Sequence, residues 1–236
     1  MSRCLLCGAA LLALTATLTA HAASFTATPV RLSLPPGASS TSLSLQNVAD
    51  QPVLVQAEVM AWSQRSGEDV LTPTEDLVVS PPIFKVAPGA SQIVRIGLLQ
   101  RGQSEREITY RLFLQEVPQP PPPGEQGISV ALRLGLPVFV LPKGGASAQL
   151  SWTARRDGDG VRIAVSNTGT GHAQIVECKL HGEDGKLIAE RALGAYVLAG
   201  QTRTWAMKTG PAWSGGKLTL SAKTSAGDVV APIVAR

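Results

Sequence analysis

The stretch "ISVALRLGLPVFVLPKG" at 128–144 decides the fold of this protein. Its even-numbered residues are all aliphatic from Ile128 to Val140, whereas the odd-numbered residues in its first half are small or polar. Side chains alternate between the two faces of a β-strand, so this pattern predicts one long strand with an apolar face. A proline-rich loop, "VPQPPPPGEQG" (117–127), precedes it in place of a tight hairpin turn. Two explanations fit the pattern: an ordinary core strand, or a strand that offers its apolar face to a partner.

The same period-two pattern recurs along most of the chain. Alternating or continuous apolar runs, separated by Gly, Pro, Asn, Asp and Ser, occupy 41–47, 52–62, 91–99, 109–117, 161–167, 173–180, 196–207, 217–224 and 229–235. Short strands at this spacing predict an all-β fold of antiparallel sandwiches. A break at Pro142, Gly144 and Gly145 divides the series, so we expect two β domains, at 23–144 and 145–236.

The N-terminal sequence predicts export. Arg3 precedes an apolar run that ends in Ala20-His21-Ala22, which matches a signal-peptide core followed by a small-residue cleavage site. We therefore expect residues 1–22 to be a signal peptide that is removed. A membrane anchor is the alternative, but the run is short and is diluted by three threonines.

Cleavage would leave Cys178 as the one cysteine of the mature chain, because Cys4 and Cys7 lie in the segment removed. A single cysteine cannot form a disulfide within the chain, so the mature protein must be held together by its cores. We interpret Cys178, in "AQIVECKLHG" (173–182), as a small buried or half-buried strand residue.

Charge and motif content argue against several classes of function. Loss of Arg3 would lower the net charge from +4 to +3, and no basic cluster with interleaved aromatic residues suggests nucleic acid binding. His172 and His181 lack a close second ligand, so we expect no metal and interpret both as polar residues at strand ends. The glycines of "TGTGHA" (168–173) are interpreted as a turn rather than a phosphate loop. No paired carboxylates or nucleophile with a nearby base stand out, so we expect no enzyme, cofactor or small-molecule substrate.

Several motifs, in order, resemble those of a known family. "TPVRLSLPPG" (28–37), "SPPIFKVAPGASQIVRI" (80–96), "TYRLFLQEVP" (109–118) and "PVFVLP" (137–142) look like the N-terminal domain of periplasmic pilus-assembly chaperones of the chaperone-usher pathway. "VRIAVSNTGTGHAQI" (161–175) is similar to the Asn-containing strand and turn of that family's second domain. The resemblance implies two immunoglobulin-like β-sandwich domains arranged as a boomerang. It also implies a periplasmic chaperone that binds pilin-like subunits and delivers them to an outer-membrane usher.

The resemblance also implies a use for the stretch at 128–144. In this family, the strand after the long F1-G1 loop is lent to an incomplete subunit and fills the groove left by its missing strand. Ile128, Val130, Leu132 and Leu134 would then be the donor segment, whereas 138–141, apolar on both faces, would belong to the core. Because an open apolar edge favours association, we expect the free protein to self-associate weakly or to cover this edge.

A pair of basic residues in the interdomain cleft binds the subunit's C-terminal carboxylate in this family. Arg31 matches the arginine of the pair, and a guanidinium can bind a carboxylate through two parallel hydrogen bonds. The family's lysine aligns with Pro137, a departure that suggests a divergent branch, such as the archaic type. Proline cannot donate to a ladder, so its nitrogen should face an open edge or a bulge.

Arg111 is our substitute candidate for the second basic residue, because an arginine within the apolar run "YRLFL" (110–114) needs a partner or a wet cleft. A solvent-facing surface position is the alternative for both Arg111 and Arg31. Arg133 and Lys143 are weaker candidates.

Two other classes of function stay open on the sequence alone. A secreted two-domain immunoglobulin-like binding protein, such as an adhesin or pilus component, would share the signal peptide and the strands. A pilus subunit, however, would carry a donor extension at its own N-terminus, whereas "SFTATPVRLSL" (24–34) resembles a first chaperone strand. An exported β-rich hydrolase would need a cleft that contains groups with shifted pKa values.

Overall fold

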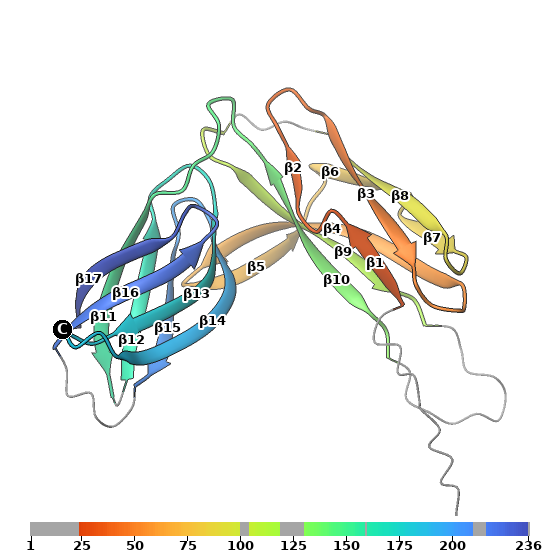
Figure 1. Ribbon diagram of the computed structural model, residues 1–236. Helices are drawn as coiled ribbons and strands as arrows, with labels where there is room; N and C mark the ends of the chain where they lie inside the picture. Colours follow the sequence, from red (N-terminus) through yellow and green to blue (C-terminus); the bar gives the residue numbers. More distant parts are fainter. Residues whose placement is uncertain (1–23, 100–103, 119–129, 159, 210–215, 236) are drawn as a thin grey trace, which may run out of the picture.

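The computed structural model describes residues 24–99, 104–118, 130–158, 160–209 and 216–235. Within these ranges the chain is all β, and it has no helix long and apolar enough to cross a membrane. Its strands form two sandwiches that meet at an angle, which gives the boomerang shape visible in Figure 1. The predicted signal peptide and Ile128 of the predicted donor segment lie outside the described residues.

The first sandwich consists of two sheets. One sheet has the strand order β1-β3-β8-β6, and the other has the order β2-β10-β9-β4-β5, with β7 also paired to β4. All of these pairs are antiparallel except that between β2 and β10, which is parallel. The strands are β1 (Phe25–Thr28), β2 (Leu32–Leu34), β3 (Ser40–Asn47), β4 (Val53–Arg65), β5 (Glu68–Pro73), β6 (Leu77–Ser80), β7 (Ile83–Val86), β8 (Ser91–Leu98), β9 (Ile108–Glu116) and β10 (Arg133–Val140).

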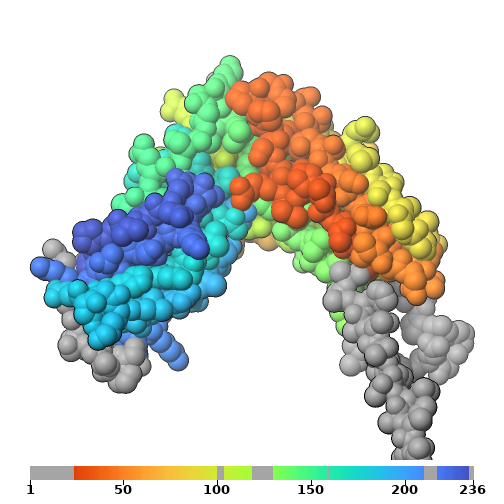
Figure 2. Space-filling view, viewed as in Figure 1, coloured from red at the N-terminus to blue at the C-terminus, as the bar shows by residue number. Residues whose placement is uncertain are grey.

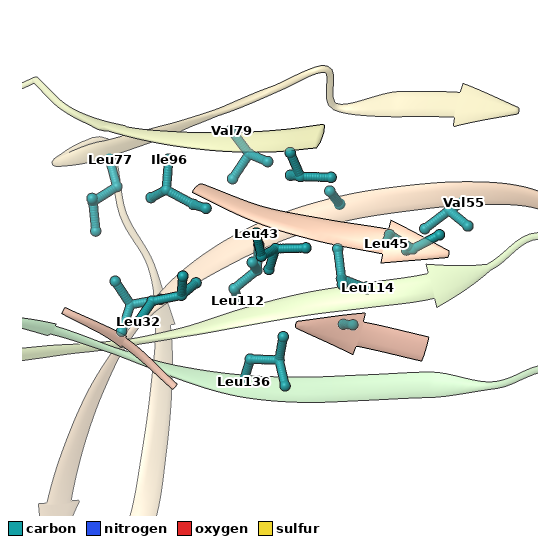
Figure 3. Close-up of a cluster of buried hydrophobic side chains, with 14 of the residues drawn as sticks. Leu32, Leu43, Leu45, Val55, Leu77, Val79, Ile96, Leu112, Leu114 and Leu136 are labelled. Atoms are coloured by element: carbon teal, nitrogen blue, oxygen red, sulfur yellow. The ribbon is translucent and has the colours of Figure 1, made fainter. Parts of the chain in front are cut away.

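Alternation along these strands builds the core between the two sheets. Figure 3 shows leucine, isoleucine and valine side chains from both sheets converging on one interior. On β10 the even-numbered residues Leu136, Val138 and Val140 belong to this core, and Leu132 and Leu134 pack against it while half-buried. The predicted apolar face of the stretch at 128–144 is therefore, over its second half, a core face.

The second sandwich is one seven-stranded sheet that folds over on itself. Its order is β14-β13-β16-β17-β11-β12-β15, and β17 and β11 join in parallel through the pair Ala154 and Ala235. The strands are β11 (Leu150–Asp157), β12 (Gly160–Asn167), β13 (Ala173–His181), β14 (Leu187–Val197), β15 (Thr202–Lys208), β16 (Gly216–Thr224) and β17 (Val229–Ala235). The predicted division between residues 144 and 145 falls in the connection from β10 to β11.

Each sandwich contains a buried asparagine that forms the same hydrogen bonds. Asn47 ends β3 and Asn167 ends β12, and both are almost fully buried. In each, the side-chain oxygen accepts a hydrogen bond from the backbone N–H two residues later in the sequence. The side-chain NH₂ group donates to two backbone carbonyls, one four residues later and one at the end of another strand. The partners are Ala49, Gln51 and Val86 for Asn47, and Gly169, Gly171 and Val197 for Asn167. We call these two residues the asparagine hubs.

Three sequence-based expectations need correction. The run at 196–207 is not one strand, because a turn at Leu198–Gln201, where Gly200 has a φ of 74°, separates β14 from β15. The strand expected from residue 128 begins only at Arg133. Finally, consecutive prolines at a strand bend permit a cis peptide bond, which we expect before Pro82 in "SPPIF" (80–84), but the cis bond lies one residue earlier, between Ser80 and Pro81.

The two faces of β8 allow a matched test of the core. Ile96 is fully buried, whereas Ile93 on the opposite face is 47% exposed. We expect Ile96→Ala to lower the free energy of unfolding by about 2–5 kcal/mol, because it removes buried methyl groups and leaves a cavity. Ile93→Ala should cost no more than about 0.5 kcal/mol. Denaturant unfolding of both variants checks this, and equal losses would contradict the assigned faces.

Cys178 lies in the core of the second sandwich, as expected from the sequence. Burial, together with the nearby charge of Glu177, raises the pKa of its thiol to about 11. Because the thiolate is the reactive form, the folded protein should resist iodoacetamide at pH 8, whereas the denatured protein should be alkylated. Mass spectrometry of both samples checks this, and rapid labelling of the folded protein would contradict the burial of the thiol.

Candidate binding site at the interdomain junction

A buried aromatic and aliphatic cluster joins the two sandwiches. Trp62 of β4 and Phe139 of β10 pack with Leu198, from the turn after β14, and Leu141 and Tyr196 pack against them. The Trp62 and Tyr196 rings meet edge to face, with centroids 5.4 Å apart. The stretch 138–141, which we assigned to the core on both faces, therefore has one face in the sandwich core and one, through Phe139, in this cluster. We call the contact region around this cluster the interdomain junction.

Hydrogen bonds from the β4–β5 hairpin fix the junction. The buried amide of Gln64 accepts from the Leu198 N–H at 3.1 Å and donates to the Tyr196 carbonyl at 2.9 Å. It also donates to the Asp69 carboxylate at 2.8 Å, and Arg203 of β15 reaches the same carboxylate at 3.5 Å. Figure 1 shows this hairpin extending from the first sandwich toward the second.

A buried carboxylate makes a second link across the junction. Glu107 accepts from both the ring Nδ1 of His172, at 2.8 Å, and the His172 backbone N–H, at 3.3 Å. The imidazole also stacks on Phe139, with ring centroids 3.6 Å apart and planes 7° apart. His172 does lie next to a strand end, as interpreted, but no sequence pattern indicated its partners on the other sandwich. Glu107 and Phe139 were missed for the same reason.

The loop that carries His172 depends on glycine. A Cβ added to Gly169 would lie 2.2 Å from the Ser147 carbonyl oxygen, and one added to Gly171 would lie 2.8 Å from the Cβ of Ala146. Only a residue without a side chain allows the chain to approach this closely. The glycines of "TGTGHA" therefore form a turn, as predicted, and this turn presents His172 to Glu107.

The two candidate anchor arginines flank Pro137 of β10, Arg31 directly before β2 and Arg111 on β9. Arg31 directly precedes Leu32, whose parallel partner on β10 is Val138, so Arg31 lies beside Pro137. On its other side, Pro137 is the antiparallel partner of Arg111 on β9. We call Arg31, Pro137 and Arg111 the arginine row.

The environment of Arg111 differs from a surface position. Its guanidinium lies 3.8 Å from the centroid of the Trp62 ring and 5.5 Å from that of Tyr196. Burial lowers the pKa of Arg111, and the Asp69 carboxylate partly opposes this effect, although an arginine stays charged in any case. Among the described residues, its guanidinium has no hydrogen-bond acceptor or salt-bridge partner. The N–H groups of a half-buried cation are thus available to a ligand.

The weaker candidates lie elsewhere. The Arg133 guanidinium lies over the Phe113 ring, 4.1 Å from its centroid, at the start of β10. Lys143 is exposed in the turn after β10. A pocket of about 320 Å³ also opens at the junction, but neither arginine of the row lines it. No group of three or more His, Cys, Asp and Glu side chains in the described part of the chain is placed to hold a metal ion.

The first half of β10 has an open edge. The Glu116 N–H donates to the Leu132 carbonyl, and the Leu141 N–H donates to the Leu34 carbonyl. The backbone N–H and C=O groups of the even-numbered residues of this strand therefore point toward β9, and those of the odd-numbered residues point toward β2. However, β2 pairs only with 138–140. Among the described strands none pairs with 133–137 on that side, and Pro137 directs its nitrogen to this edge, as expected. Val130, just before the strand, is 85% exposed.

The fold and the junction define a class of protein: two immunoglobulin-like sandwiches joined at a fixed angle, with one strand edge left open. The family described as "Pili and flagellar-assembly chaperone, PapD N-terminal domain" matches residues 24–146, and the chain belongs to this family.

Solved structures show the same two-domain fold. A chain in the complex of CsuC with the tip adhesion subunit CsuE, from archaic chaperone-usher Csu pili of Acinetobacter baumannii, matches with a TM-score of 0.69 and 21% identity, over 91% of this chain and 100% of that one. The Salmonella enterica complex of SafA pilin with the SafB chaperone matches with a TM-score of 0.63 and 20% identity, over 89% and 94%. The Pseudomonas aeruginosa CupB2 chaperone matches with a TM-score of 0.58 and 18% identity, over 88% and 98%. No curated protein matches the sequence.

Removing the Gln64 amide should loosen the junction without unfolding either sandwich. Gln64→Ala leaves the Leu198 N–H and the Tyr196 carbonyl without this partner, at a cost of about 1–3 kcal/mol. We expect residual dipolar couplings to report a wider range of interdomain orientations. Gln46→Ala, on an exposed face of β3, is the matched control. Identical orientations in Gln64→Ala and wild type would contradict this role.

Proposed function

We propose that this protein is a periplasmic chaperone that binds incomplete pilin-like subunits by donor-strand complementation. In this proposal, the first half of β10 and the residues before it supply the strand that the subunit lacks. The protein then delivers the subunit to an outer-membrane usher. Family membership and the match to complexes of chaperones with a pilin or tip subunit support this role.

The observation that carries the proposal is the open edge of β10. The backbone N–H and C=O groups of Arg133 and Gly135 point away from β9, and no described strand pairs with them on that side. Val130 is exposed, and Leu132 and Leu134 are only half-buried at the same place. A strand added here would gain backbone hydrogen bonds and cover these side chains, and each aliphatic side chain that becomes fully buried contributes about 1.5–3 kcal/mol before ordering costs.

The arginine row supplies the second half of the proposed site. Arg31 and Arg111 lie on either side of β10, next to the end of the open edge. A strand that lies along this edge and ends at the row would bring its terminal carboxylate between two cations. Each guanidinium can donate two parallel hydrogen bonds to it, which would set the register of the bound strand. Arg111 would thus replace the lysine expected at Pro137.

Two further parts of the proposal rest on the sequence. The N-terminal stretch with its small-residue cleavage site supports export to the periplasm with removal of residues 1–22. The open apolar edge supports weak self-association of the free protein until a subunit covers it.

A secreted two-domain binding protein without chaperone activity is the second candidate, because it would have the same fold. The open edge favours the chaperone, since a protein that only binds through its loops has no need of an unpaired apolar strand. Unpaired edges of this kind promote aggregation and are normally covered.

Affinity purification of the tagged protein from periplasm tests this function. Wild type should co-purify with a small secreted β-rich subunit, identified by mass spectrometry. Val130→Lys/Leu132→Lys should reduce recovery at least tenfold, because each lysine places a charge in an apolar contact. Arg31→Ala and Arg111→Gln should do the same, because each removes one cation from the carboxylate.

Matched variants control for nonspecific effects. Ile93→Lys adds a charge at an exposed apolar position on β8, and Arg95→Ala removes an exposed arginine from the same strand. Both should recover the subunit as wild type does. Recovery that is indifferent to Val130 and Leu132, or no subunit with wild type, would refute the chaperone function and favour the binding protein.

A further inference from the structure

Two residues of the second sandwich face the arginine row. Gln174 on β13 and Tyr196 on β14 are direct cross-strand partners, so their side chains lie on the same face of the sheet. Gln174 contacts Arg31, and Tyr196 contacts Arg111. The two arginines on one sandwich therefore meet two neutral side chains that are neighbours on the other.

The contact to Arg31 is a directed hydrogen bond. Nη2 of Arg31 donates to the side-chain oxygen of Gln174 at 2.9 Å. The backbone of Gln174 is itself held by Ser225, since its N–H donates to the Ser225 hydroxyl at 2.8 Å and its carbonyl accepts from the Ser225 N–H at 2.9 Å. The backbone of the residue that carries this acceptor is thus held by its own sandwich.

The contact to Arg111 is made by aromatic rings. Trp62 supplies one ring, at 3.8 Å, and Tyr196 supplies the other, at 5.5 Å. A ring face attracts a guanidinium and leaves its N–H groups free in the plane of the cation. The Tyr196 backbone is fixed by Gln64 and Arg203, which both donate to its carbonyl.

These contacts hold the two guanidinium groups in place without neutralising their charge. An amide oxygen and an aromatic face hold a guanidinium without cancelling its charge, whereas a carboxylate in either place would do both. Asp69, the acid that acts electrostatically on Arg111, is bound by Gln64 and Arg203. Neither guanidinium therefore forms a salt bridge with a described carboxylate, and Asp69 acts on Arg111 only through space.

We propose that Gln174 and Tyr196 are positioning residues that aim Arg31 and Arg111 at a carboxylate, so that the second sandwich forms half of the anchor. This inference rests on the proposed chaperone function and extends it. The first sandwich supplies the charges, and the second supplies neutral supports that keep those charges free for the ligand. Binding of a terminal carboxylate then depends on the junction as well as on the arginines.

Gln174→Glu distinguishes this role from a structural brace. The glutamate keeps an oxygen near Arg31 and adds a charge that favours the contact, so a brace would be preserved or strengthened. A positioning role predicts the opposite for the ligand, because the fixed carboxylate competes with the incoming one. We expect recovery of the subunit to fall at least tenfold with no loss of thermal stability. Gln46→Glu, with the same charge change at an exposed position on β3, should recover the subunit normally.

The free protein provides a test without any subunit. In ¹H-¹⁵N spectra that resolve arginine Nε–H groups, sodium acetate should shift the Arg31 and Arg111 signals saturably, whereas sodium chloride at equal ionic strength should not. Gln174→Glu should abolish the shift at Arg31. Tyr196→Leu should weaken the shift at Arg111 severalfold, and Tyr196→Phe should restore it, because the ring rather than the hydroxyl holds the cation.

The outcomes separate the two proposals. Acetate that shifts neither arginine signal in wild type, or subunit recovery unchanged by Gln174→Glu, overturns the positioning role. If acetate shifts both signals and the variants respond as expected but wild type recovers no subunit, the carboxylate site stands and the chaperone function fails.

Discussion

The buried amide of Gln64 is the contact on which the geometry of the junction depends. It ties a strand of the first sandwich to the Tyr196 carbonyl and the Leu198 N–H of the second. Tyr196 faces Arg111, and its cross-strand partner Gln174 faces Arg31, so a rotation of one sandwich would move both supports away from both arginines at once. Figure 2 shows the two lobes packed against each other at the apex and separated below it. The contacts at this apex therefore determine how the residues of one sandwich are placed relative to those of the other.

Proline at position 137 changes how charge is distributed at this site. A lysine here would extend a flexible cation from β10 itself, whereas Arg111 comes from the neighbouring strand and its guanidinium carbon lies over the Trp62 ring. A guanidinium held on a ring loses less conformational freedom when it binds than a free lysine does. Because Pro137 also has no N–H to donate, the last residue of the open edge offers a strand only its carbonyl.

Local pattern was sufficient to predict the fold but not the junction. Alternation predicted the all-β class, most of the longer strands and the burial of Cys178, because those properties depend on neighbouring residues along the chain. It joined β14 and β15 into one strand, since the apolar pattern continues through the turn at Gly200. His172 and Glu107 meet only because two separately folded units come together, 65 positions apart in sequence, and no periodicity encodes such a pairing.

The two asparagine hubs support loops with different surroundings. In the first sandwich the hub supports an exposed turn at 87–90. In the second it supports the turn at Leu198, which packs against the first sandwich. The same internal bonds thus shape a loop whether or not a second lobe covers it. Each asparagine hub therefore depends only on residues of its own sandwich. Because domains generally fold as units, N-terminal first during synthesis, the hub of the first sandwich can be complete before the second sandwich has been made.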